Sequence, residues 1–186
     1  MAAVVSQRPR RGVFPGSFNP LTVAHVEIAR LAHNRYELDT VVLVVSRVAL
    51  DKPAPPGPGF EERLALLRAD AAAHSWLAVE HTDKQLIAEI AQGFDVVIMG
   101  ADKWIQVKNP AYYVDTAARD AALATLPTVV VAERAGVADP GDEVTLLKTP
   151  ADLRDVSSSA ARAGNRDLMA PEARKHWKQR PPTPPH

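Results

Sequence analysis

The chain has 186 residues, enough for one domain with a sizeable core, and 46% of them are hydrophobic. Lys+Arg and Asp+Glu balance at 22 each, so overall charge gives no reason to expect nucleic acid or an anionic membrane as a partner. Cysteine is absent, which excludes disulfides and thiolate metal sites. Apolar runs stay short of the roughly 18 residues of a membrane span, and we expect a cytoplasmic protein without a secretory leader.

Short β-branched segments alternate with segments of helical period along the chain. The expected strands are Gly12–Phe14, Thr40–Ser46, Trp76–His81, Asp95–Gly100, Thr128–Glu133 and Val144–Lys148. The second, fourth and fifth are apolar throughout, as is typical of strands covered on both faces. This alternation predicts an α/β fold with a doubly wound parallel sheet.

Four helices are expected beside these strands. One begins near Thr22, one carries the apolar stripe of residues 60–71, one covers residues 82–93 and one runs from Asn109 to about Ala124. The third opens with Thr82 and Gln85, a capping-box pattern. We place the domain at residues 12–178, between a flexible start (1–11) and a Pro-rich, disordered tail (179–186).

Unusual residues follow several of the expected strands. These segments are Gly12–His25, the loop with Lys52, Gly100–Trp104 and Val156–Arg162. In open α/β sheets, ligands bind at the carboxyl ends of the strands, around the point where the strand order reverses. We therefore expect these segments to converge on one crevice.

The stretch "GVFPGSFNPLTVAH" has the composition of an anion-binding turn. Gly16 allows backbone to approach a ligand, Pro20 stiffens the turn, and Thr22 is an expected N-cap. The N–H groups of the helix that follows would face an anion, and His25 adds a donor.

The stretch "VSSSAAR" repeats this chemistry near the other end of the chain. Its serines supply hydroxyl and N–H donors, and Arg162 lies one helical turn beyond Ser158 and Ser159. Together the two stretches predict a local anion-binding cleft on a protein of zero net charge.

Both stretches resemble signatures of the nucleotidylyltransferase superfamily. "GSFNPLTVAH" is similar to G-x-F-x-P-x-[TH]-x-G-H, and "VSSSAAR" is similar to I-S-S-[TS]-x-x-R. "IMGAD", the pairing of Lys52 with "FEERLALL", and "LMAPEARKHW" resemble segments of the nicotinate/nicotinamide mononucleotide adenylyltransferases. The resemblance spans residues 11–177 and implies a Rossmann-like, doubly wound parallel sheet of the nucleotidylyltransferase type.

Three positions depart from the pattern. Trp104 comes sooner after the G-x-D segment than the family's substrate-stacking tryptophan. Ala24 stands where the family has glycine packed against the nucleotide. Thr22 stands where the mononucleotide enzymes carry histidine; threonine there, like the preceding "PGSF", resembles the pantetheine-phosphate adenylyltransferases.

The resemblance implies transfer of AMP from ATP to nicotinate or nicotinamide mononucleotide, with release of pyrophosphate, in NAD biosynthesis. It implies Mg²⁺ carried on the ATP phosphates; no protein metal ligand is expected. Transfer of an adenylyl or cytidylyl group to another phosphorylated acceptor, such as phosphopantetheine, is an alternative. A catalytically silent nucleotide-binding relative is another, and the oligomeric state, a homo-oligomer included, is left open.

The implied site residues fall into three groups. Those expected to act in catalysis, the first two at the α-phosphate, are His25, Thr22 and Arg162. Those expected to bind ATP are Gly16, Ser17, Phe18, His25, Gly100, Asp102, Ser157, Ser158, Ser159 and Arg162. Those expected at the acceptor are Lys52 and Trp104. Simpler roles stay open: helix caps for His25, Asp102 and the serines, solvent for Lys52, and core packing for Trp104.

Overall fold

The computed structural model describes residues 8–47, 57–137 and 140–177, so Lys52 and the predicted tail lie outside the described residues. The sheet consists of β1 (Arg11–Pro15), β2 (Thr40–Ser46), β3 (Leu77–Thr82), β4 (Val96–Gly100), β5 (Thr128–Ala132) and β6 (Thr145–Leu147). Its order is β3-β2-β1-β4-β5-β6, and every pairing is parallel. This is the doubly wound, Rossmann-like sheet that the sequence predicts.

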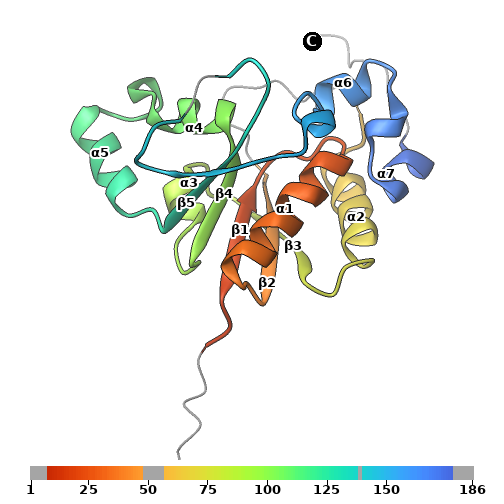
Figure 1. The fold of residues 1–186 in the computed structure, drawn as a ribbon, viewed down its shortest axis with the longest axis horizontal. Helices are drawn as coiled ribbons and strands as arrows, with labels where there is room; N and C mark the ends of the chain where they lie inside the picture. Colours follow the sequence, from red (N-terminus) through yellow and green to blue (C-terminus); the bar gives the residue numbers. More distant parts are fainter. Residues whose placement is uncertain (1–7, 48–56, 138–139, 178–186) are drawn as a thin grey trace, which may run out of the picture.

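Helices cover both faces of the sheet (Figure 1). They are α1 (Val23–Tyr36), α2 (Phe60–Ala71), α3 (Ile87–Ile90), α4 (Ala101–Lys108), α5 (Thr116–Ala124), α6 (Ser158–Arg162) and α7 (Pro171–His176). The strands alternate between two cores because successive side chains point to opposite faces. Phe14 and Leu43 belong to the core that includes α1 and α2 residues, whereas Val13 and Val42 belong to the core under α3 and α4.

The helix predicted over residues 82–93 is wrong in extent. Thr82 is the last residue of β3, where it pairs with Ser46, and α3 is a single turn. The Thr82 hydroxyl accepts a hydrogen bond from the Lys84 backbone at 3.2 Å, which shapes a turn and caps no helix. Sheet pairing therefore overrides the local capping pattern.

The helix predicted over residues 109–124 is interrupted. Asn109 caps a 3-10 turn at Pro110–Tyr112, and the Tyr113 hydroxyl donates to the Val107 carbonyl at 2.8 Å. A new helix, α5, starts at Thr116, capped by Asp115, which accepts from the Ala118 N–H at 2.7 Å. Two short polar caps thus divide one Ala-rich stretch into two elements.

The ordered domain begins before the predicted boundary at residue 12. Arg11 opens β1, and the Arg8 guanidinium pairs with the Asp95 carboxylate at 2.6 Å. The Arg10 backbone N–H donates to the Asp39 carboxylate at 2.7 Å. The basic residues 8–11 are therefore attached to the edge where β1 and β4 begin.

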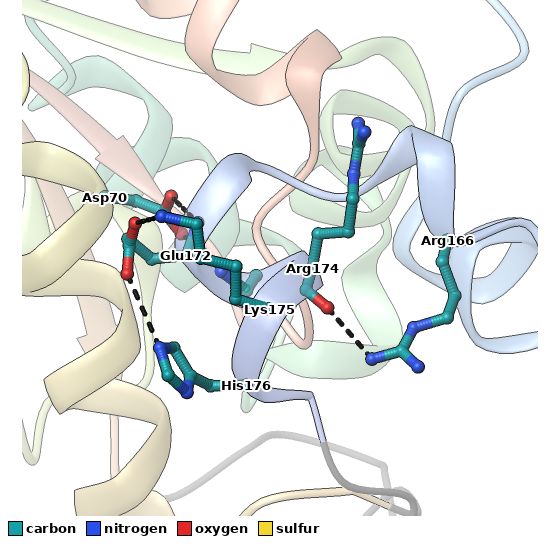
Figure 2. A network of polar contacts seen from close by, with 7 residues as sticks. Asp70, Arg166, Glu172, Arg174, Lys175 and His176 are labelled. Atoms are coloured by element: carbon teal, nitrogen blue, oxygen red, sulfur yellow. Dashed lines mark hydrogen bonds and ion pairs between the residues drawn. The ribbon is translucent and has the colours of Figure 1, made fainter.

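Helix α7 docks on α2 through one buried carboxylate (Figure 2). Asp70, near the end of α2, accepts from the backbone N–H groups of Glu172 and Ala173 at 2.7 and 3.1 Å. Burial raises the pKa of Asp70 despite these hydrogen bonds. On the other side of α7, the Arg166 guanidinium donates to the Arg174 carbonyl at 2.9 Å.

No helix within the described ranges is both long and apolar enough to cross a membrane.

Candidate active site

The loop that follows β1 lies at the switch point, because β1 has β2 on one side and β4 on the other. Phe18 has a positive φ of 41°, and the Asn19–Pro20 peptide bond is cis. A Cβ at Gly16 would stand 2.7 Å from the Phe18 ring, so Gly16 is needed to seat this ring. Internal packing is thus a reason for glycine here in addition to the expected close approach of a ligand.

Most of this loop is enclosed by protein. Phe18 is 2% exposed, so the structure gives its side chain no access to ATP. Ser17 is exposed and Gly16 is half-buried. Of the predicted binding residues in the loop, these two are therefore the ones open to a ligand.

The two predicted signatures meet in space, as the sequence indicates. The Ser158 hydroxyl donates to the Pro20 carbonyl at 2.7 Å, and the Arg162 guanidinium donates to the Asn19 carbonyl. The backbone N–H of Ala170 adds a hydrogen bond to the Leu21 carbonyl at 3.0 Å. In Figure 1, α6 lies next to the start of α1.

Helix α6 is only five residues long, with Ser157 as its N-cap, accepting from the Ala160 N–H at 3.1 Å. A single turn carries little of the dipole expected of a longer helix. Its contribution to the site therefore comes mainly from side chains: the Arg162 guanidinium also donates to the exposed Ser159 hydroxyl at 3.1 Å.

His25 lies in the first turn of α1, against two aromatic rings. The Phe18 and Phe14 ring centroids are 5.2 and 6.0 Å from that of His25, both in edge-to-face arrangements. Burial, and then the positive charge of Arg134, lower the pKa of His25 to about 4. The imidazole is therefore neutral at neutral pH, yet part of its surface is open to solvent.

Thr22 caps α1, as predicted, and its predicted contact with the α-phosphate would require a residue that the structure encloses. The residue is 0% exposed, and its polar atoms face His25: Thr22 Oγ1 is 2.7 Å from His25 Nδ1. The two residues form a capping box in which histidine takes the place of the usual Glu or Gln.

Arg134 is a site residue that the sequence reading missed. It follows β5 and acts on the charge of His25, while its guanidinium pairs with the Asp102 carboxylate at 3.3 Å. Asp102, in the first turn of α4, is thereby brought to the same region as His25. The rule that ligands bind beyond strand ends would have found Arg134 had it been applied to β5.

Gly100 starts α4 without a side-chain cap, and a Cβ built on it would meet no atom within 4 Å. The first backbone N–H groups of α4 thus have no side-chain cap at the end of β4, beside the switch point. Gly100 is half-buried, and its position at the nucleotide stays a prediction.

Trp104 does not join this group. It is 4% exposed and packs in the core under α3 and α4, with Lys108 over its ring at 5.1 Å. It also lines a cavity of about 440 Å³ formed with the first residues of β5 and β6, at the opposite edge of the sheet. Trp104, expected at the acceptor, therefore lies in a core, which is the simpler role that the sequence left open for it.

The described residues offer no ready-made metal site. No three His, Cys, Asp or Glu side chains gather there to hold an ion. Arg134 acts on the charge of His25 and also pairs with the Asp102 carboxylate, so this carboxylate already has a partner. A divalent ion at this edge would need most of its oxygen ligands from a phosphate-bearing substrate and water.

Comparisons with known proteins agree with this geometry. The chain is 28% identical over 151 residues to the probable nicotinate-nucleotide adenylyltransferase of Geobacter sp. (strain M21), a match covering 74% of this chain and 64% of that protein. It is 32% identical over 96 residues to the phosphopantetheine adenylyltransferase of Nitratidesulfovibrio vulgaris (strain DP4), covering 50% of this chain and 48% of the relative. The chain thus spans between about half and two thirds of these curated relatives.

The fold matches that of the Plasmodium falciparum nicotinic acid mononucleotide adenylyltransferase complexed with NaAD. The TM-score is 0.62 at 15% identity, over 83% of each chain, so this likeness concerns the fold. The family model described as Cytidylyltransferase-like matches residues 13–164, which include the last three residues of β1, the loop after it and all of α6. The chain therefore belongs to the cytidylyltransferase-like family of the nucleotidylyltransferase superfamily.

Proposed function

We propose that the protein transfers the adenylyl group of ATP to the phosphate of a mononucleotide and releases pyrophosphate. Nicotinate mononucleotide is the first candidate acceptor, which would place the reaction in NAD biosynthesis. Two observations carry the proposal: Arg162 donates to the Asn19 carbonyl in the loop that leads to His25, and Arg134, beyond the end of β5, acts on the charge of His25. The relatives named above support the reaction class more firmly than the acceptor.

Adenylyl transfer requires the protein mainly to position the two substrates and to supply positive charge. A phosphate monoester is largely ionised at neutral pH, so its oxygen can attack the α-phosphorus of ATP without a side-chain base. The bond between the α-phosphorus and the bridging oxygen breaks, and pyrophosphate leaves with the electron pair. Repulsion between two anions and charge on the α-phosphate are the main obstacles, and positioning and positive charge address both.

Each residue then has a definite task in the proposal. His25 donates a hydrogen bond to the α-phosphate, which strengthens as charge develops in the transition state. Arg162 and Arg134 supply positive charge for the β- and γ-phosphates, with the Ser159 hydroxyl as a further donor. Asp102 accepts from the ribose hydroxyls once ATP draws Arg134 towards its phosphates. Lys52, outside the described residues, stays the proposed partner of the acceptor phosphate.

Mg²⁺ enters this proposal as part of the substrate. It would arrive on the ATP phosphates, where it neutralises charge on the leaving pyrophosphate. None of the steps assigned to the residues above depends on a protein ligand to the ion.

An acceptor panel tests the proposal. The full chain is mixed with ATP, Mg²⁺ and one of three acceptors: nicotinate mononucleotide, nicotinamide mononucleotide or phosphopantetheine. Pyrophosphate release is followed, and the product is identified by mass. We expect release with a pyridine mononucleotide and its loss in His25→Gln, with Asp120→Asn, a change of an exposed carboxylate on α5, as the matched control.

The other outcomes are equally informative. Turnover of phosphopantetheine alone would move the protein to the second group of relatives. Turnover with CTP in place of ATP would change the transferred group. ATP binding in calorimetry without pyrophosphate from any acceptor would overturn the enzyme proposal in favour of a nucleotide-binding relative without turnover.

A further inference from the structure

The contacts between Thr22 and His25 do more than cap α1. Thr22 is completely buried, so its polar groups serve the protein and not a ligand. Its backbone N–H donates to His25 Nδ1 at 3.1 Å, and its hydroxyl oxygen lies 2.7 Å from the same nitrogen. The His25 backbone N–H completes the box with a 3.4 Å contact to the Thr22 hydroxyl.

This geometry decides where the imidazole proton sits. A backbone N–H can only donate, so His25 Nδ1 must be its acceptor. A hydrogen on Nδ1 would point at the amide hydrogen of Thr22 and repel it. In the neutral ring the proton therefore occupies Nε2, an assignment that follows from the hydrogen-bond network.

The other side of the ring is left for a ligand. Within the described residues, Nε2 has no hydrogen-bond partner, and it is not one of the fully enclosed polar atoms. His25 Nε2 can thus present one N–H donor to a molecule in the site.

The surroundings keep the ring neutral. The rings of Phe14 and Phe18, from β1 and the loop after it, offer no negative charge to an imidazolium. Arg134, which follows β5, is the charged group in the described structure that acts on His25, and it repels a second cation. No carboxylate faces the ring from these elements to stabilise its charged form.

We propose that Thr22 is a positioning residue that holds His25 as a neutral imidazole with its proton on Nε2. The ring then works as a fixed hydrogen-bond donor that neither gives up nor takes a proton during the reaction. This rests on the proposed function only for its catalytic consequence; the tautomer itself is a property of the protein without substrate.

NMR of the full chain labelled with ¹⁵N-histidine tests the tautomer directly. The His25 ring is assigned by the signal that disappears in His25→Gln. At neutral pH we expect Nδ1 to show the shift of an unprotonated acceptor nitrogen and Nε2 that of a protonated one. Protonation at Nδ1, or a fully charged ring, in the wild-type chain would overturn the proposal.

Three threonine variants test the role of Thr22. Thr22→Val removes the hydroxyl but keeps the shape and the backbone N–H that donates to Nδ1, so the proton should stay on Nε2 while the pKa of His25 rises by about one unit. Thr22→Ser should restore the wild-type pattern. Thr125→Val, which removes an exposed hydroxyl at the end of α5, should change nothing. A folded Thr22→Val in which the pKa of His25 is unchanged would remove the Thr22 hydroxyl from this role.

The kinetic consequence separates the two proposals. With a working acceptor, kcat should fall about tenfold in Thr22→Val with little change in KM and return in Thr22→Ser. A neutral, Nε2-protonated ring in a chain that turns over no acceptor would leave the positioning role in place and refute the enzyme. Turnover of an acceptor by a chain whose His25 ring is protonated at Nδ1 would support the enzyme and refute the positioning role.

Discussion

The guanidinium of Arg162 donates a hydrogen bond to the backbone carbonyl of Asn19, 143 residues away in the sequence. The neighbouring Ser158 hydroxyl holds the next carbonyl, that of Pro20, at 2.7 Å. Because these bonds join α6 to the loop after β1, Arg162 has two functions in one side chain. It fixes the loop beside His25 and brings positive charge to the region proposed for the triphosphate.

Arg162 variants separate the hydrogen bonds of the planar guanidinium from its positive charge. In Arg162→Ala we expect kcat to fall about 100-fold and the melting temperature to drop, because both the loop contact and the charge are lost. Arg162→Lys keeps a cation but cannot reproduce the planar fork, so it should recover ATP binding better than kcat. Pyrophosphate release and thermal melts measure both. Wild-type kcat and KM in Arg162→Ala would remove this residue from the site.

Asp102 should matter for ATP and little for the fold. Its ion pair with Arg134 is solvent-exposed, and such pairs contribute about 0.2–1 kcal/mol. Asp102→Asn should therefore leave unfolding nearly unchanged but raise the KM for ATP about tenfold, since it weakens a charged acceptor for the ribose hydroxyls. Steady-state kinetics at varied ATP checks this, with Asp120→Asn as the control. An unchanged KM would show that Asp102 serves only Arg134.

The stability of the chain should depend on the pH through His25. The pKa of His25 is about 4 in the folded chain and near 6.5 when unfolded, so between these values the unfolded chain binds more protons. Stability is therefore fully present above the unfolded pKa and is lost as the pH falls towards 4. From about pH 7.5 to about pH 5 the loss should be about 2 kcal/mol.

Urea unfolding of the wild type and of His25→Gln across this pH range isolates the effect. The two chains differ only at position 25, so the difference between the two curves belongs to that position. Parallel curves would contradict the lowered pKa.

Asp70 should be the residue on which α7 depends most. Asp70→Ala removes both hydrogen bonds to the start of α7 and should cost about 2 kcal/mol of stability. Asp167→Ala is the matched control, because its carboxylate is 91% exposed and should change stability by less than about 0.5 kcal/mol. Urea denaturation measures both. Equal effects of the two substitutions would mean that α7 docks through its apolar contacts alone.

The sequence predicted the parts of the fold that follow from hydrophobic periodicity and from the alternation of strands and helices along the chain. The apolar runs at residues 40–46 and 96–100 are buried parallel strands, and their carboxyl ends mark the site. The segments that failed are those decided by partners distant in sequence. Thr82 looked like a helix cap but pairs with Ser46 in the sheet. Trp104, expected at the acceptor, fills a core, the simpler role that the sequence left open for it.

The roles inside the site were harder to predict than its location. Thr22 and His25 lie three residues apart at the start of α1, yet Thr22 is enclosed beside Met169 and Ala170, from the other end of the chain, while His25 is partly open. Arg134 has no motif of its own, and only its ion pair with Asp102 and its effect on His25 reveal it. The sequence can therefore indicate which polar residues follow a strand. The direction in which their side chains point depends on tertiary contacts.

Ala24 offers a test of this distinction between motif and structure. In the resembling family, glycine at this position packs against the nucleotide, which would suggest that the Ala24 methyl obstructs ATP. The residue is 3% exposed in the second position of α1, so the methyl group is enclosed by the protein. Ala24→Gly should therefore leave the KM for ATP unchanged and lower stability by about 0.5–1 kcal/mol, because glycine adds backbone freedom to the unfolded chain. Kinetics and urea unfolding of this one variant decide the matter: a several-fold lower KM would mean that the methyl does face the nucleotide, and that the first turn of α1 opens when ATP binds.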